Sequence, residues 1–140
     1  MPSNIQHTAQ AAHNERLLLH LRQQAIHAEY GDWYVTVAFY AAIHHVEAML
    51  FTKKQLVRDT VIKHSTDVRK ILGSLSDHGA REWLLRRVFR NLYDPYMNLY
   101  QLSQVAKYAC HVPNESDWSV AVSLLERMKV ECEIARIGQK

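Results

Sequence analysis

The most apolar stretch of the chain runs from Asp32 to Thr52 and predicts one long buried helix. On a helical projection, apolar residues surround the segment DWYVTVAFYAAIHHVEAMLFT, and only Tyr34, His45 and Thr52 form a narrow polar strip. A helix that is apolar nearly all round lies in the middle of a protein or spans a membrane. Because this segment also holds two histidines and a glutamate, which are costly in hydrocarbon, we expect the central helix of a bundle.

Amphipathic helices are predicted on both sides of this segment. One covers residues 12–29, a short one opens near Ser65 after a charged connection at 53–63, and a long one starts near Asp77. We expect Asp94-Pro95 to break or kink the long helix, because proline lacks a backbone donor. The last helix, from about Ser116, carries the clearest apolar stripe.

These elements predict an all-α fold, an antiparallel bundle of about five helices around the apolar helix at 32–52. Residues 1–11 are polar and are expected to be frayed or disordered, so that 12–138 form a single domain. The long helix is expected to have a core side and a basic side. The core side is Leu84, Leu85, Val88, Phe89 and Leu92, and the basic side is Arg81, Arg86, Arg87 and Arg90.

Composition adds little that is specific. Of the 140 residues 48% are hydrophobic and 22% are charged, as in ordinary globular proteins. The net charge of +3 permits an RNA or another anionic partner without requiring one. Cys110 and Cys132 have no metal-ligand spacing, and the N-terminus lacks the features of a secretion signal, so we expect reduced thiols in a cytoplasmic protein with no membrane partner.

Motifs for cofactors and metals are missing from the sequence. There is no glycine-rich phosphate loop and no nucleophile elbow, and residues 44–47 read His-His-Val-Glu, the reverse of the Glu-x-x-His order of di-iron bundles. We therefore expect no cofactor and no metal. A zinc site made from scattered histidines, as in DinB-like bundles, is the weaker alternative.

Two groups of polar residues stand out on the predicted helices. Tyr40, His44 and Glu47 form a candidate buried polar cluster on the central helix, in which His44 is expected to bond Glu47 or a tyrosine. The second group is a row of histidines that recurs every seven residues on the first helix, namely His13, His20 and His27. This row either contacts an acidic partner or a second subunit, or it lies at the boundary between core and solvent.

Three blocks between Asp32 and Tyr108 resemble the HEPN family of bacterial and archaeal helical proteins. They are DWYVTVAFYAAIHHVEAML, HSTDVR and YQLSQVAKY. The resemblance implies a helical bundle that is usually dimeric. Many HEPN domains are metal-independent ribonucleases of toxin–antitoxin, CRISPR or phage-defence systems, and others are inactive RNA-binding or accessory modules.

Active HEPN members carry an arginine followed, after four to six residues, by a histidine. Arg22 with His27 and Arg58 with His64 both satisfy this spacing, although neither pair lies on the late helix where active members usually keep it. The chemistry behind the motif is that a guanidinium binds the scissile phosphate bidentately and an imidazole acts as general acid or base.

By this resemblance, His64 would be the acid or base, Arg69 and Lys107 the phosphate contacts, and Tyr108 an orienting or stacking group. The resulting hypothesis is an RNA-associated accessory or toxin-type module, which is a weak or inactive metal-independent ribonuclease and forms a homodimer. The alternative is a non-enzymatic protein-interaction bundle with a nucleotidyltransferase-type partner. A third reading is small-ligand binding inside the bundle.

Overall fold

The computed structural model describes residues 2–23, 30–73, 75–108 and 113–138. Its elements are α1 (Asn4–Gln23), α2 (Gly31–Lys53), β1 (Leu56–Val57), β2 (Thr60–Val61), α3 (Ser65–Leu72), α4 (Asp77–Arg87), α5 (Arg90–Tyr108) and α6 (Glu115–Ile137). The prediction of an all-α bundle is confirmed. The described residues hold six helices instead of about five, and one small antiparallel hairpin.

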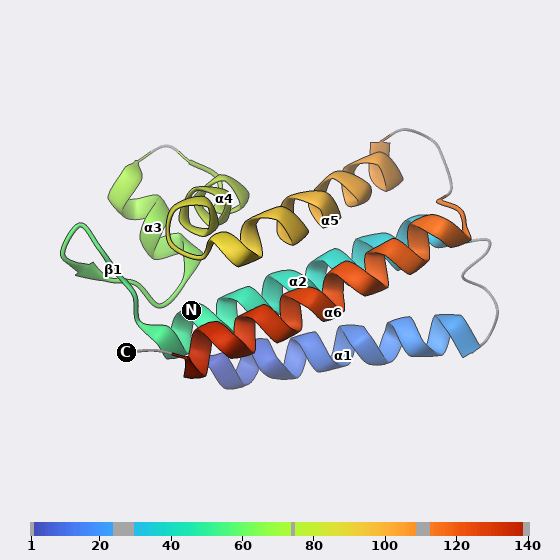
Figure 1. The fold of residues 1–140 in the computed structure, drawn as a ribbon, viewed down its shortest axis with the longest axis horizontal. Helices are drawn as coiled ribbons and strands as arrows, with labels where there is room; N and C mark the ends of the chain where they lie inside the picture. The colour runs from blue at the N-terminus through green and yellow to red at the C-terminus, as the bar shows by residue number, and fades with distance from the viewer. Residues whose placement is uncertain (1, 24–29, 74, 109–112, 139–140) are drawn as a thin grey trace.

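Helix α2 is the centre of the bundle and packs against α1, α5 and α6. Figure 1 shows that α1 and α5 run antiparallel to α2, whereas α6 runs in the same direction as α2. The short helices α3 and α4 pack on each other near the C-terminal end of α2, and α4 also contacts α5. The apolar segment at 32–52 is therefore the central helix, as predicted.

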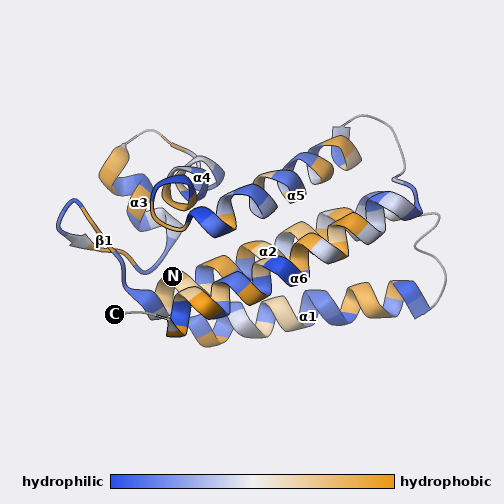
Figure 2. Cartoon of the chain, viewed as in Figure 1, coloured by the Kyte–Doolittle hydropathy of each residue, from blue (hydrophilic) through white to orange (hydrophobic). Residues whose placement is uncertain are grey.

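The burial of α2 follows from its side chains. Figure 2 shows hydrophobic residues over most of α2, whereas polar and apolar stretches alternate along α1. Val35, Ala42 and Val46 are fully buried. By length and composition α2 could also cross a membrane, yet 61% of its most apolar window is buried inside the bundle, as expected for a core helix.

Tyr34, the first residue of the predicted polar strip on α2, is not exposed as that prediction implied. Tyr34 is buried, with an exposed fraction of 3%, whereas Trp33 is 61% exposed. Tyr34 forms a side-chain hydrogen bond with Arg22 and lines a pocket with Trp118. Neighbouring helices thus cover the side of α2 that carries the tyrosine, and the adjacent tryptophan faces outward.

The N-terminal segment is not frayed. Helix α1 begins at Asn4, and His7 and Ala11 are both buried. The prediction failed because polar residues surround these two, so that too few apolar side chains mark the buried face. The predicted end of this helix at 24–29, including His27, lies outside the described residues, and His13 and His20 are exposed.

The chain does not break at Asp94-Pro95, although the alternative of a kink there stays a prediction. Helix α4 ends at Arg87 and α5 begins at Arg90 and continues through Pro95. Pro95 stands in the second turn of α5, where its missing N–H removes one bond of the helix ladder. The helix continues despite this loss, and residues 88–89 turn the chain instead.

The charged connection at 53–63 contains the hairpin β1–β2. Leu56 pairs with Val61 and Val57 with Thr60. The two turn residues, Arg58 and Asp59, have φ angles of 49° and 63°, the signs that a two-residue type I′ turn requires. Such turns favour asparagine and glycine, and Arg58-Asp59 therefore carries no hairpin signal.

The close approach of α2 and α6 at Gly31 leads to a prediction about stability. A Cβ added to Gly31 would clash with the indole Nε1 of Trp118 and lie 2.6 Å from the carbonyl oxygen of Pro113. Because overpacking costs about 1–3 kcal/mol, we expect Gly31→Ala to lower the free energy of unfolding by that amount in urea titrations.

The matched control is Gly79→Ala in α4, where the nearest atom, Ser76 Oγ, lies 3.3 Å from the added Cβ. Alanine is the better helix former, so this change is expected to be neutral or stabilising. Equal stability of both variants would contradict the close approach at Gly31.

Candidate functional site

The side chain of Glu47 on α2 is 1% exposed and connects three helices. The Nε of Arg81 on α4 donates to its Oε1 at 2.8 Å, and the hydroxyl of Ser65 donates to the same oxygen. The backbone N–H of Ser65 donates to Oε2 at 3.0 Å, and the Nε2 of His64 lies 3.3 Å from Oε2. A buried carboxylate is thus satisfied by donors from α3 and α4.

Local capping fixes the start of α3 against Glu47. His64 is the N-cap, and its Nδ1 accepts a hydrogen bond from the backbone N–H of Thr66 at 3.2 Å. The carboxylate of Asp67 accepts in return from the N–H of His64, which completes a capping box. This geometry leaves the N–H of Ser65 free to bind Glu47, where a carboxylate also suits the helix N-terminus.

Arg81 is buried, although the sequence analysis assigned it to the exposed basic side of its helix. Its neighbours Ala80, Leu84 and Leu85 form the buried side of α4. Its Nη1 lies 3.5 Å from the hydroxyl of Tyr96, whose pKa is raised to about 12 by burial. The prediction was wrong because the partner that stabilises this charge, Glu47, lies 34 residues away in the sequence.

His7 of α1 and His44 of α2 extend the cluster. Their Nδ1 atoms lie 2.9 Å apart, and the ring of His7 lies 5.2 Å from the rings of both His44 and His64. Burial lowers the pKa of His7 to about 4 and lowers the pKa of His44 against the opposing effect of Glu47. Both imidazoles are therefore neutral at pH 7.

We call this group the Glu47 cluster; its members are His7, His44, Glu47, His64, Ser65 and Arg81. His44 and Glu47, two of the predicted members of a polar cluster on α2, both belong to it, with Glu47 buried and His44 half-buried. Tyr40 does not, because its side chain is 45% exposed. His44 bonds His7 instead of Glu47 or a tyrosine.

The four residues predicted to be catalytic are distributed over separate places. His64 belongs to the Glu47 cluster, whereas Arg69 is exposed with its Nη1 3.6 Å from Asp77. Lys107 lies over the ring of Tyr40 at 5.1 Å, and its neighbour Tyr108 is 76% exposed.

Tyr40 stands seven residues before Glu47 on α2, about 10 Å along the helix axis. Lys107 and Tyr108 line a pocket of about 380 Å³ with Asp32, Trp33 and Tyr40. The structure therefore brings Lys107 and Tyr108 together near Tyr40, and it does not bring them to His64.

The contacts of His64 bear on its predicted chemistry. Its Nδ1 accepts the capping bond, and its Nε2 faces the Glu47 carboxylate. A general acid or base needs a nitrogen within hydrogen-bond reach of the substrate, and both nitrogens of His64 are already engaged. Ribonuclease catalysis by His64 stays a prediction.

Three members of the cluster were not singled out from the sequence: His7, Ser65 and Arg81. Arg81 had a detectable signal, because it stands among the apolar positions Ala80, Leu84 and Leu85. His7 and Ser65 had none, since each lies in a polar stretch.

Comparison with known proteins adds no family. A scan against protein-family models, a search of curated proteins and a search of solved structures each found no match. The resemblance to HEPN proteins therefore depends on the sequence blocks alone.

The buried ion pair makes a prediction about stability. Removing one partner of such a pair leaves an uncompensated buried charge, which typically costs about 3–5 kcal/mol. We expect Glu47→Ala to lower the free energy of unfolding by about that amount, because Arg81 then lacks its carboxylate. Urea titrations of wild type and variant measure the difference.

The control is the exposed pair of Arg69 and Asp77, whose side chains are 53% and 44% exposed. Arg69→Ala is expected to cost under about 1 kcal/mol, because solvent screens the pair. A loss for Glu47→Ala no greater than the loss for Arg69→Ala would refute the structural role of the cluster.

Proposed function

We propose that this protein is an RNA-associated helical module of HEPN-like type, which binds RNA without cleaving it through His64. The observation that carries the proposal is the distribution of charge. Residues 53–90 contain ten lysines and arginines but four aspartates and glutamates, a net charge of +6, whereas the rest of the chain has a net charge of −3. A concentration of positive charge in one part of a protein favours polyanions such as RNA.

Most of these basic side chains are available to a partner. Arg86, Arg87 and Arg90 are exposed at the junction of α4 and α5, and Arg58 and Lys63 are exposed on and after the hairpin. Figure 1 places the hairpin, α3 and α4 at the same end of the molecule. We call this region the basic end; arginine is well suited to it, because its planar guanidinium binds phosphate bidentately.

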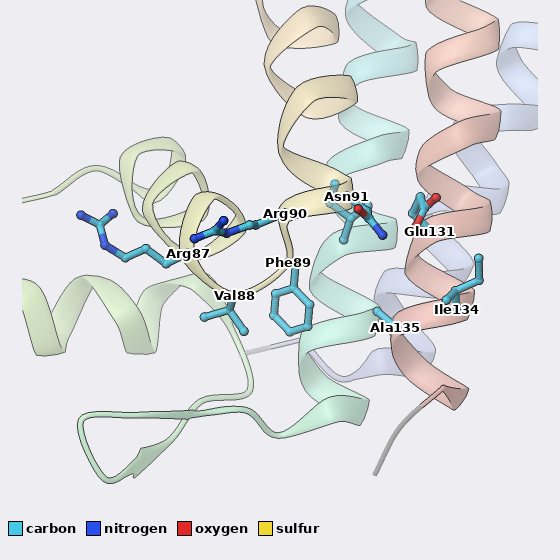
Figure 3. A pocket seen from close by; sticks show the side chains of 9 residues that line it. Arg87, Val88, Phe89, Arg90, Asn91, Glu131, Ile134 and Ala135 are labelled. Carbon is cyan, nitrogen blue, oxygen red and sulfur yellow. The ribbon is translucent and has the colours of Figure 1, made fainter.

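A pocket of about 360 Å³ lies beside the basic end, between the α4–α5 junction and α6. Figure 3 shows Arg87 and Arg90 on one side of this pocket and Glu131 on the other. The guanidinium of Arg87 also stacks 4.6 Å above the ring of Trp83, which restricts its motion. We expect phosphate contacts on the arginine side, away from the carboxylate of Glu131.

Charge reversal tests the proposal. We expect Arg86→Glu combined with Arg90→Glu to weaken binding of a labelled single-stranded RNA at least about tenfold, because two phosphate contacts become repulsive. Fluorescence anisotropy at two salt concentrations measures the dissociation constant, and wild-type binding should weaken as salt increases.

The matched control is Arg16→Glu combined with Arg127→Glu, which changes the net charge equally at exposed positions outside the basic end. This variant should keep near wild-type affinity. An equal loss in both variants would mean that net charge alone attracts RNA, and wild-type protein that binds no RNA at low salt would overturn the proposal.

A separate incubation tests for cleavage. Labelled RNA is expected to stay intact with wild type and with His64→Ala in the presence of EDTA, because both nitrogens of His64 are engaged. Gel electrophoresis of the RNA gives the result. Cleavage by wild type that disappears in His64→Ala would contradict this expectation and support the hypothesis of a metal-independent ribonuclease.

A protein-interaction role is favoured by a different surface. A groove of about 500 Å³ between α5 and α6 is lined by exposed Val105 and Val120 and by Leu102 and Leu124. Such an apolar groove suits a helical partner. Recovery of one stoichiometric protein and no nucleic acid in a pull-down would support this second candidate, and the predicted homodimer stays a prediction.

A further inference from the structure

Three residues of the Glu47 cluster offer ligand atoms of the kind that bind transition metals. His7, Glu47 and His64 come from α1, α2 and the N-cap of α3, and one nitrogen or oxygen from each lies within 4.8 Å of the others. Zinc binds imidazole nitrogen and carboxylate oxygen at about 2.0–2.2 Å. Inward shifts of under about 1 Å would bring the three atoms to that distance, which side-chain rotation can supply.

His7 provides the strongest single observation. Its Nδ1 is engaged by His44, and its Nε2 is buried with no hydrogen-bond partner among the described residues. The whole residue is 3% exposed. A buried polar atom without a partner costs free energy, and a metal ion would satisfy this nitrogen.

The hydrogen bond between His7 and His44 allows the tautomer of His7 that metal binding needs. When the Nδ1–H of His7 donates to the Nδ1 of His44 at 2.9 Å, the lone pair of His7 lies on Nε2. Histidine ligands commonly donate their second N–H to such an outer partner, which fixes the ring.

His64 can join the site without losing all its contacts. Metal binding at Nε2 would move the proton of the neutral ring to Nδ1, which could then donate to the hydroxyl of Thr66 at 3.1 Å. That bond would replace the capping bond that Nδ1 accepts from the backbone N–H of Thr66. The start of α3 would thus remain attached to the histidine.

The charges around the site decide which metal it suits. Arg81 neutralises Glu47 through Oε1, whereas Oε2 accepts from the backbone N–H of Ser65 and faces His64 with its remaining lone pair. Ca²⁺ and Mg²⁺ prefer all-oxygen sites, commonly with several carboxylates, which one neutralised glutamate does not provide. Two imidazoles and one carboxylate oxygen suit Zn²⁺ and neighbouring transition metals.

We propose that His7, Glu47 and His64 bind one Zn²⁺ ion, with His44 as the residue that positions His7. Because these ligands come from three separate elements, the ion would join α1 to α2 and α3. Three protein ligands leave a fourth position for water or another small ligand. The proposal is independent of RNA binding, since the basic end and the Glu47 cluster are different sites.

Metal titration tests the proposal. Untagged wild-type protein, stripped with EDTA and desalted, should bind one equivalent of Zn²⁺ in isothermal titration calorimetry and unfold at a higher temperature with the ion. His7→Gln should lose this binding, and His44→Gln should weaken it about 10–100-fold. His13→Gln is the matched control, because His13 is an exposed histidine of the same helix; it should bind as wild type does.

Two results would overturn the proposal. One is folded, stripped wild-type protein that binds no Zn²⁺, and the other is His7→Gln that binds one equivalent as tightly as wild type. Circular dichroism checks that each variant is folded. If His7→Gln fails to fold, Co²⁺ bound to wild type decides instead: absorption bands typical of nitrogen and oxygen ligands support the site, and their absence refutes it.

Discussion

A buried negative charge on the central helix is the constraint on which the arrangement of the short helices depends. Glu47 is 1% exposed, and an isolated carboxylate in such a place would be very unfavourable. Ser65 and Arg81 supply the donors that make its burial tolerable, and they belong to α3 and α4. The position of these two helices against α2 is therefore specified by polar contacts as well as by apolar packing.

The exposed surfaces follow from the same arrangement. With α1, α5 and α6 packed on α2, the short helices and the hairpin gather at one end and bring most of the basic residues with them. Lys107 and Tyr108 lie elsewhere, beside Tyr40. The buried Glu47 cluster, the basic end and the pocket beside Tyr40 are three distinct places, so evidence for a role of one does not transfer to another.

The sequence predicted the long helices better than the site, for a physical reason. A nearly continuous apolar run marks α2 and an apolar stripe marks α6. Both patterns are local, because they lie within a single helix. Local patterns also produced errors. Pro95 predicted a break inside α5 that is not there, and the hairpin was not predicted because Arg58-Asp59 lacks the usual turn residues.

The Glu47 cluster depends on contacts between distant segments. Glu47 and Arg81 are 34 residues apart, and His7 and His44 are 37 apart. A single sequence contains no signal for such pairs. It identified His44 and Glu47 from their place on an apolar helix, but it could not identify His7. The helical spacing of Arg81 with Leu84 and Leu85 marked its buried position, but not its partner Glu47.

Among the described residues, helix α1 packs mainly on α2, and it is also joined to the bundle by Glu15 with Lys129 of α6 and by the ring of His7 against the ring of His64. A terminal helix can open separately from the rest of a protein, at a lower free energy than global unfolding. Because His7 covers the inner polar side chains from α1, separation of this one helix would admit solvent to them while the other helices stay packed. Entry to the interior would then be governed by transient detachment of the N-terminal helix.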